Sequence, residues 1–178
     1  MWRLSILLGP AAAPLLLLVL SVPQILPIGI PGTGVALAAP MLFLAVGLLR
    51  YRQRVALPRW IGRRRLESHH FARLFSVVDR MLVGLERFSR PRAKHFLGRG
   101  MRIGIAAAIV LMVALILLPL PTGNPPAAAS VVAFAVGLLR RDGLFALLGI
   151  VLALIAVAWN VGLAALIFVA GVEIWSIL

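Results

Sequence analysis

The six residues AVGLLR occupy positions 45–50 of the chain and recur at positions 135–140, ninety positions later. A proline- and glycine-containing break precedes each copy. We call residues 31–34 (PGTG) the first breaker and residues 121–125 (PTGNP) the second breaker. Each unit therefore consists of a long apolar segment, a breaker, a short apolar segment and an arginine. Because the breakers also stand ninety positions apart, the pattern predicts an internal duplication.

The composition is that of a membrane protein. Hydrophobic residues make up 62% of the chain, charged residues 13%, and the mean hydropathy is +1.07. An average soluble domain is about half apolar and about a quarter charged. A membrane-spanning helix needs about 20 residues. The 178 residues therefore predict an all-α polytopic membrane protein with a single membrane domain and about six membrane-embedded segments.

The basic residues are concentrated in the middle of the chain. Residues 50–102 contain fifteen of the eighteen Lys and Arg residues and three acids, a net charge of +12. Basic residues next to membrane segments stay in the cytoplasm, so we expect this segment there. Attraction to anionic lipid headgroups explains the charge more simply than nucleic acid does. Arg63, Arg64 and Arg65 follow Trp60 and indicate a membrane interface.

Residues 66–88 predict an amphipathic helix within the basic segment, because apolar residues recur there every three or four positions. The helix can lie in the headgroup plane, or it can pack on the cytoplasmic end of the bundle or on a second subunit. His69 and His70 are adjacent and point in different directions, so we expect no metal site. The absence of cysteine excludes disulfides and thiol chemistry, and we expect no cofactor.

The expected order is a first repeat at about 4–50, a basic interfacial segment at 51–102, a second repeat at about 103–141 and a C-terminal hairpin at 144–178. We expect a break near Trp159 to Gly162, because 34 apolar residues would form a helix about 50 Å long. No small residues spaced for cleavage follow the first apolar run, so we expect no signal-peptide cleavage.

The segments after the breakers are too short to cross a membrane. Residues 35–49 reach about 22 Å as a helix, and residues 127–139 reach less. We therefore expect both breakers inside the membrane profile. In the second breaker, Asn124 should cap the new helix and Pro125 should fit its first turn.

The breakers form the candidate binding site. A helix start exposes N–H groups and a partial positive charge, and broken helices in transporters aim such starts at anionic substrate groups. The predicted substrate-binding residues are Pro31, Gly32, Thr33, Gly34, Pro121, Gly123, Asn124 and Pro125. The alternative is that both breakers are only tight hairpin turns.

The charged candidates lie at the segment ends. Arg50 and Arg140 are expected interfacial anchors, Asp142 should pair with Arg140 or Arg141, and Glu173 beside Trp175 should be interfacial. A parallel repeat places these arginines and both chain ends in the cytoplasm. An inverted repeat instead places Arg140, Arg141 and Asp142 outside or along a site within the membrane.

Several motifs resemble the ExoD family of bacterial exopolysaccharide-synthesis membrane proteins. They are LPRWI at 57–61, RRRL at 63–66, LPLPTGNPPA at 118–127 and GLLRRDG at 137–143. The resemblance implies a cytoplasmic-membrane protein needed for exopolysaccharide production. It assigns no catalytic residue.

Two functions remain open. The first is a transporter- or channel-like component that handles an anionic or lipid-phosphate substrate and works as a homodimer. The second is a non-transporting scaffold whose basic segment docks lipids or exopolysaccharide-synthesis proteins. We do not expect an enzyme, because the membrane segments contain no paired carboxylates, metal triad or nucleophile and base.

Overall fold

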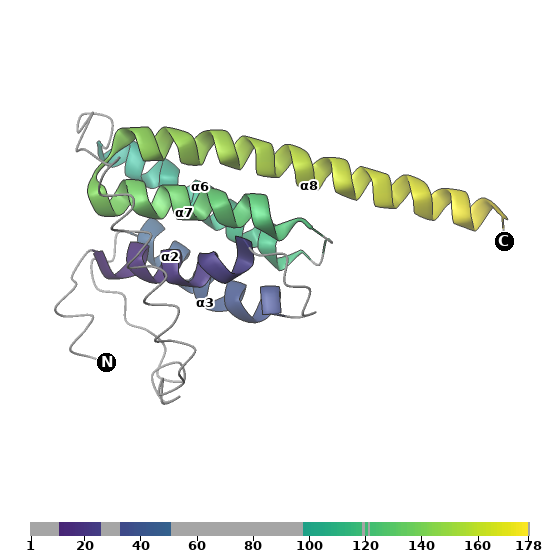
Figure 1. Cartoon of the computed structure of the whole chain (residues 1–178), viewed down its shortest axis with the longest axis horizontal. Coiled ribbons are helices and arrows are strands. Elements are labelled where there is room, and N and C mark those ends of the chain that lie inside the picture. Colours follow the sequence, from purple (N-terminus) through teal and green to yellow (C-terminus); the bar gives the residue numbers. More distant parts are fainter. Residues whose placement is uncertain (1–10, 26–32, 51–97, 119, 121, 178) are drawn as a thin grey trace.

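The computed structural model describes residues 11–25, 33–50, 98–118, 120 and 122–177. Within these ranges every regular element is a helix, which confirms the predicted all-α class. The helices are α2 (Ala12–Ile25), α3 (Thr33–Leu49), α6 (Arg99–Leu117), α7 (Asn124–Arg140) and α8 (Gly143–Ile177). Figure 1 shows four of them side by side and the long α8 continuing past their ends.

The prolines explain where several helices begin and end. In α2, Pro14 lies in the first turn, where its missing N–H has no intrahelical partner to lose, and Pro23 lies in the last turn. Pro125 and Pro126 occupy the first turn of α7 in the same way. Pro23 and Pro40 differ from these prolines, because they lie beyond the first turns of α2 and α3 and each removes a backbone donor from its helix.

The four shorter helices form two hairpins, α2–α3 and α6–α7, and each helix packs mainly against the non-equivalent helix of the other hairpin. The most extensive contacts between the hairpins join α2 to α7 and α3 to α6. A shift of ninety positions maps α2 onto α6 and α3 onto α7, so each contact joins the first helix of one hairpin to the second helix of the other. Large, fully buried side chains from all four helices fill the centre, including Leu17, Leu18, Met41, Leu44, Ile109, Met112, Val131 and Phe134.

Both hairpins point the same way. The Gln24 side chain near the end of α2 donates to the carbonyl oxygen of Gly34 at the start of α3, and Gly34 lies against Asn124 at the start of α7. The two helix starts therefore meet at one end, which we call the breaker end. This is the geometry of the parallel arrangement; that the halves are a duplication stays a prediction.

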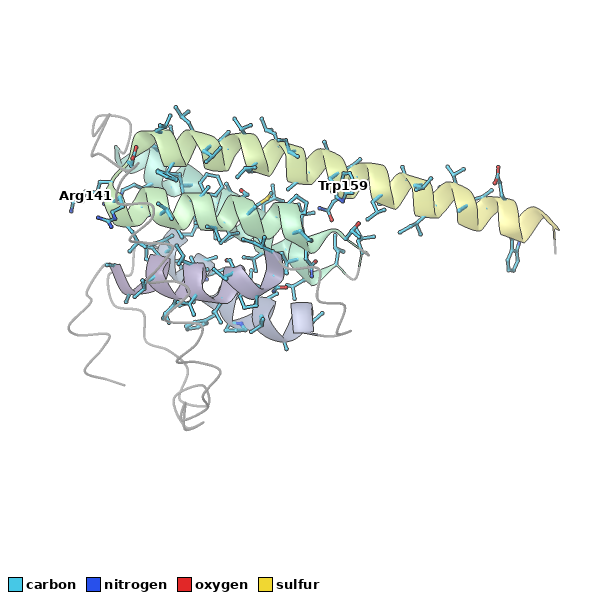
Figure 2. The ribbon with its side chains drawn as sticks, in the orientation of Figure 1. Arg141 and Trp159 are labelled. Atoms are coloured by element: carbon cyan, nitrogen blue, oxygen red, sulfur yellow. The ribbon has the colours of Figure 1, made fainter. Side chains whose placement is uncertain are left out.

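The basic residues of the described ranges lie at the other end, which we call the arginine end. Arg50 follows the last residue of α3, Arg102 is in the first turn of α6, and Arg140 and Arg141 end α7. Figure 2 places Arg141 at the corner between α7 and α8. These arginines are thus separated from the breakers by the length of the short helices.

The central helix α7 packs very closely against α8. Ten residues of α7 between Ala127 and Leu138 are buried. A Cβ atom on Gly137 would lie 2.9 Å from the backbone nitrogen of Ala146, and one on Gly149 would lie 2.5 Å from the ring of Phe134. The Ser130 hydroxyl donates to the carbonyl oxygen of Gly149 over 2.9 Å. The absence of side chains at the two glycines allows the two backbones to approach.

Two residues form the corner between α7 and α8. Arg141 has a left-handed backbone, with φ of 53° and ψ of 43°, and its N–H bonds to the carbonyl oxygen of Gly137. Asp142 is buried, and its carboxylate accepts from the N–H of Leu144 over 2.9 Å. Asp142 therefore caps the start of α8.

The expected C-terminal hairpin is wrong, because α8 runs unbroken for 35 residues, about 52 Å. No proline interrupts it. The Asn160 amide donates to the carbonyl oxygen of Ala156 one turn earlier, over 2.8 Å, so it bonds within the helix instead of ending it. Gly162 alone costs only about 1 kcal/mol relative to alanine, too little to break so apolar a helix.

The second half of α8, which we call the tail (residues 161–177), leaves the body of the protein (Figure 1). Its large apolar side chains are exposed, with Leu166 at 65%, Phe168 at 72% and Trp175 at 82%. Gly100–Leu117 and Gly143–Glu173 are long and apolar enough to cross a membrane, yet only 33% and 28% of their residues are buried. A core helix of a soluble protein would be mostly buried, so these helices indicate a membrane protein.

We predict that Gly137→Ala destabilises the protein by about 1–3 kcal/mol, because the neighbours of the new methyl group are backbone atoms of α8 that cannot turn aside. Thermal unfolding in detergent measures the change. Gly162→Ala is the matched control, because a methyl group on Gly162 would point into open space, with no neighbouring helix within 4 Å. That change should leave stability the same or raise it by up to about 1 kcal/mol. Equal melting temperatures for the two variants would contradict the close packing.

Candidate functional site: the polar cluster at the breakers

Three amide side chains from three helices gather at the breaker end. The chain has four Asn and Gln residues, and three of them lie in apolar surroundings: Gln24 of α2, Asn124 of α7 and Asn160 of α8. Gln24 is 6% exposed and Asn160 is 2% exposed. With Gly34 and Gly123, these amides form what we call the breaker cluster.

The first breaker contributes Gly34. The Gln24 amide donates to the carbonyl oxygen of Gly34 over 3.2 Å. A Cβ atom on Gly34 would lie 2.6 Å from Nδ2 of Asn124 and 3.7 Å from Oε1 of Gln24. Glycine at this position therefore allows two amides from different hairpins to approach one backbone. Gly34 and Asn124 also stand ninety positions apart, so equivalent positions of the two hairpins touch.

The second breaker is held by α8. The Asn160 amide donates to the carbonyl oxygen of Gly123 over 3.2 Å, and the indole N–H of Trp159 donates to the carbonyl oxygen of Thr122 over 3.2 Å. Thr122 has a φ of 61°, a backbone conformation that β-branched residues rarely adopt. Figure 2 shows Trp159 on α8 at the level where α7 begins. Two neighbouring residues of α8 thus satisfy two consecutive breaker carbonyls.

Two buried oxygen atoms of the cluster have no hydrogen-bond partner within the described ranges: Oδ1 of Asn124 and Oδ1 of Asn160. The Asn160 amide nitrogen bonds to the carbonyl oxygens of Gly123 and Ala156. That arrangement fixes the orientation of the amide and leaves its oxygen as the unpaired atom. An unpaired buried acceptor costs about 1–3 kcal/mol, so each oxygen should accept a hydrogen bond from a water molecule or a ligand.

The starts of α3 and α7 add partial positive charge to the same place. Their supply of free N–H donors is unequal, however. The first turn of α7 contains Pro125 and Pro126, which have no N–H. The first turn of α3 contains no proline. The ends of α2 and α6 lie at the same end of the protein and carry partial negative charge. The cluster therefore combines acceptor oxygens with helix N–H donors that come mainly from α3.

The structure brings together the central members of the predicted site. Gly34, Gly123, Asn124 and Pro125 lie at the breaker end, and Thr33 begins α3. Three predicted members, Pro31, Gly32 and Pro121, lie outside the described residues.

The predicted capping role of Asn124 is wrong. Gly123 holds the capping position of α7, no side chain caps the helix, and Asn124 is its first helical residue. The reason lies in the neighbouring hairpin, because the Asn124 amide lies against Gly34 instead of turning back onto its own helix.

The charged candidates lie elsewhere. Arg50, Arg140, Arg141 and Asp142 are at the arginine end, and exposed Glu173 is near the end of the tail. Asp142 caps α8, and its pairing with Arg140 or Arg141 stays a prediction. Arg63, Arg64 and Arg65 lie outside the described residues, as do the amphipathic segment 66–88 and all three histidines. In the ranges that the structure describes, no three His, Cys, Asp or Glu side chains group together.

Sequence reasoning missed Gln24, Trp159 and Asn160. One signal could have found the two amides, because an uncharged amide inside an apolar run must find a hydrogen-bond partner. Asn160 was instead interpreted as part of a helix break. Trp159 carries no comparable signal, since tryptophan is also common at membrane interfaces.

These features define a helical membrane protein with a buried polar cluster where two helix breaks meet. The chain belongs to the ExoD family of exopolysaccharide synthesis, whose sequence pattern matches residues 3–162. This confirms the resemblance seen in the motifs and ties the protein to exopolysaccharide synthesis. Neither the curated proteins nor the solved structures contain a match. The matched range ends two residues after Asn160, where α8 leaves the body.

We predict that Gly34→Ala destabilises the protein by about 0.5–1.5 kcal/mol, because the new methyl group meets the end of the Asn124 side chain, which must turn away from its present rotamer. The double variant Gly34→Ala/Asn124→Ala should lose less stability than the sum of the two single changes, since truncating Asn124 makes room for the methyl group. Thermal unfolding of all four proteins in one detergent gives the coupling. Additive effects would show that the two breakers do not touch.

Proposed function

We propose that this protein is a transport component of exopolysaccharide synthesis that handles an anionic or lipid-phosphate substrate at the breaker cluster, without catalysing a reaction. One observation carries the proposal. Two helix breaks from separate hairpins meet, and two buried amide oxygens beside them have no partner among the described residues. Transporters use broken helices in this way to bind substrates within the membrane.

The length of α8 supports a position of the breakers inside the membrane. From Asp142 to Glu173 the helix measures about 46 Å, which matches the roughly 40–45 Å of a bilayer with its headgroups when the helix tilts by about 20°. Before Glu173 the tail contains only apolar residues, which favour hydrocarbon over water. Asn160, which bonds to the second breaker, is about 27 Å along the helix from Asp142, so the breakers fall close to the midplane.

The other helices fit this placement. The 14 residues of α2 and the 17 of α3 and α7 are about 21 and 26 Å long, less than the roughly 30 Å of a hydrocarbon core. The α2–α3 and α6–α7 hairpins would then enter from the arginine side and turn back at the breakers. Backbone inside a membrane must be shielded from lipid and hydrogen-bonded, and Gln24, Trp159 and Asn160 supply such bonds.

Charge supports the orientation. The arginine end leads directly into the segment that carries most of the positive charge, which favours the cytoplasmic side of the bacterial inner membrane. The same end would contact anionic lipid headgroups. A homodimer is part of the proposal, because a body of four short helices and one long helix is small for enclosing a pathway by itself.

The basic segment supports a second candidate function. Fifteen of the eighteen Lys and Arg residues lie between positions 50 and 102, and such a segment can dock a protein onto anionic lipids or onto synthesis proteins. In that case the protein is a scaffold and the breaker cluster only stabilises the fold.

Single cysteines test the membrane position, and the chain has no cysteine of its own. Arg141, Thr122 and Trp175 are all exposed on the protein, so their labelling reports whether they face water or lipid. We predict that a membrane-impermeant maleimide labels Trp175→Cys from outside the cell and Arg141→Cys only after the membrane is opened. Thr122→Cys should stay unlabelled in both cases. Labelling of Thr122→Cys as fast as that of Trp175→Cys would place the breakers in water.

Reconstitution separates the two functions. The protein is placed in phosphatidylcholine vesicles with a trace of fluorescent phosphatidylglycerol, and a quencher that cannot cross the membrane is added outside. We expect the protein to move labelled lipid from the inner to the outer leaflet, where its fluorescence is quenched. We expect Asn124→Leu to slow this movement about tenfold, equivalent to about 1.4 kcal/mol. Replacing Arg63, Arg64 and Arg65 with glutamine should leave the rate unchanged. No movement by the native protein, together with loss of exopolysaccharide only in the arginine variant, would support the scaffold.

A further inference from the structure

We infer that the breaker cluster selects a substrate headgroup that carries hydroxyl groups, because the amide oxygens of Asn124 and Asn160 are its two buried polar atoms without a hydrogen-bond partner in the part of the chain that the structure describes. This inference rests on the proposed function and names the chemistry of its substrate. An amide oxygen only accepts hydrogen bonds. The ligand must therefore bring donors, as the hydroxyls of a sugar or a glycerol do.

A bare anion does not fit the two oxygens. Phosphate and carboxylate oxygens are acceptors and would be repelled by other acceptors at hydrogen-bonding distance. The prolines at positions 125 and 126 also remove donors that a helix start would otherwise offer to an anion. The negative charge of a headgroup would be attracted to the starts of α3 and α7. Its hydroxyl groups would donate hydrogen bonds to the amide oxygens.

A metal cation fits less well than a hydroxyl group. The starts of α3 and α7 bring partial positive charge to Gly34 and Asn124, and the ends of α2 and α6 bring partial negative charge to the same end of the protein, so the helix ends offer a cation no net attraction. The amides that contribute the free oxygens are neutral, and the carboxylates of Asp142 and Glu173 lie in other parts of the structure. A neutral hydroxyl group can donate a hydrogen bond to the same lone pairs and needs no negatively charged ligand.

The geometry assigns different roles to the two amides. Asn160 is 2% exposed and is held by two hydrogen bonds through its nitrogen, so its oxygen has a fixed position. Asn124 is only half-buried as a residue, and its change does not disturb the bonds of Asn160. Asn124 therefore lies nearer the approach to the cluster, and its substitution is the cleaner test.

Two lipids with the same single charge provide the test. Phosphatidylglycerol carries a glycerol headgroup with two hydroxyls, whereas phosphatidylmethanol carries a methyl group and no hydroxyl. The full chain is reconstituted in phosphatidylcholine nanodiscs, and each lipid competes against a fluorescent phosphatidylglycerol for binding. The native protein should prefer phosphatidylglycerol by about 3- to 10-fold for each hydrogen bond formed.

Substitutions connect the preference to the cluster. Asn124→Leu should bring the ratio of the two affinities close to one, and Asn160→Leu should do the same if its melting temperature shows that it still folds. Ser130→Ala is the matched control, because Ser130 is a buried polar residue of α7 that bonds to Gly149 away from the breakers. Its ratio should equal that of the native protein.

The outcomes are distinct. Equal affinity for the two lipids, or a preference that survives Asn124→Leu, would overturn the inference and leave the two oxygens as water-binding groups, while the proposed function stands. Failure of both anionic lipids to compete would overturn the inference and the lipid-phosphate substrate together. A preference lost in Asn124→Leu and kept in Ser130→Ala supports the hydroxyl selectivity.

Discussion

The close contact between α7 and α8 determines where the rest of the protein lies. Gly137 and Gly149 let the two backbones approach, the Arg141–Asp142 corner fixes one end of the pair, and Asn160 fixes the other end by bonding to Gly123. Since α7 also packs against α2 and α6, the position of α7 relative to α8 fixes the positions of both hairpins. The position of α8 in a membrane would thus set the depth of both breakers.

The breaker cluster shows why a protein would keep polar side chains in so apolar a chain. Backbone carbonyls outside a helix in an apolar environment require donors, and Trp159 and Asn160 provide them to Thr122 and Gly123. Gln24 adds a bond to the carbonyl oxygen of Gly34 in the first turn of α3. Each amide that donates also carries an oxygen. For Asn160 that oxygen has no partner among the described residues, so satisfying the backbone creates an acceptor. The same side chain thus supports the breaker and provides the acceptor on which the proposed ligand selectivity rests.

The sequence predicted the local features of the fold better than its long-range contacts. The repeated AVGLLR correctly placed the end of α3 at Leu49, and the breakers correctly placed the starts of α3 and α7. The sequence alone does not show that Asn160 bonds to Gly123, 37 positions earlier. Trp159 and Asn160, which interrupt an apolar run, therefore predict a helix break that the structure does not contain. The expected capping role of Asn124 is wrong for a similar reason. Capping preferences consider only neighbouring residues in the sequence, and the Asn124 amide lies against Gly34 of the other hairpin.

The dependence of the second breaker on α8 has a consequence for how the chain enters a membrane. Thr122 and Gly123 emerge during synthesis well before Trp159 and Asn160, the residues whose side chains bond to their carbonyls. Until α8 is made, the tip of the α6–α7 hairpin lacks these donors and is poorly suited to hydrocarbon. With the breakers inside the membrane, as proposed, deep burial of that hairpin would be a late event in biogenesis, completed when the last helix is made, and the order of synthesis would become part of the folding mechanism.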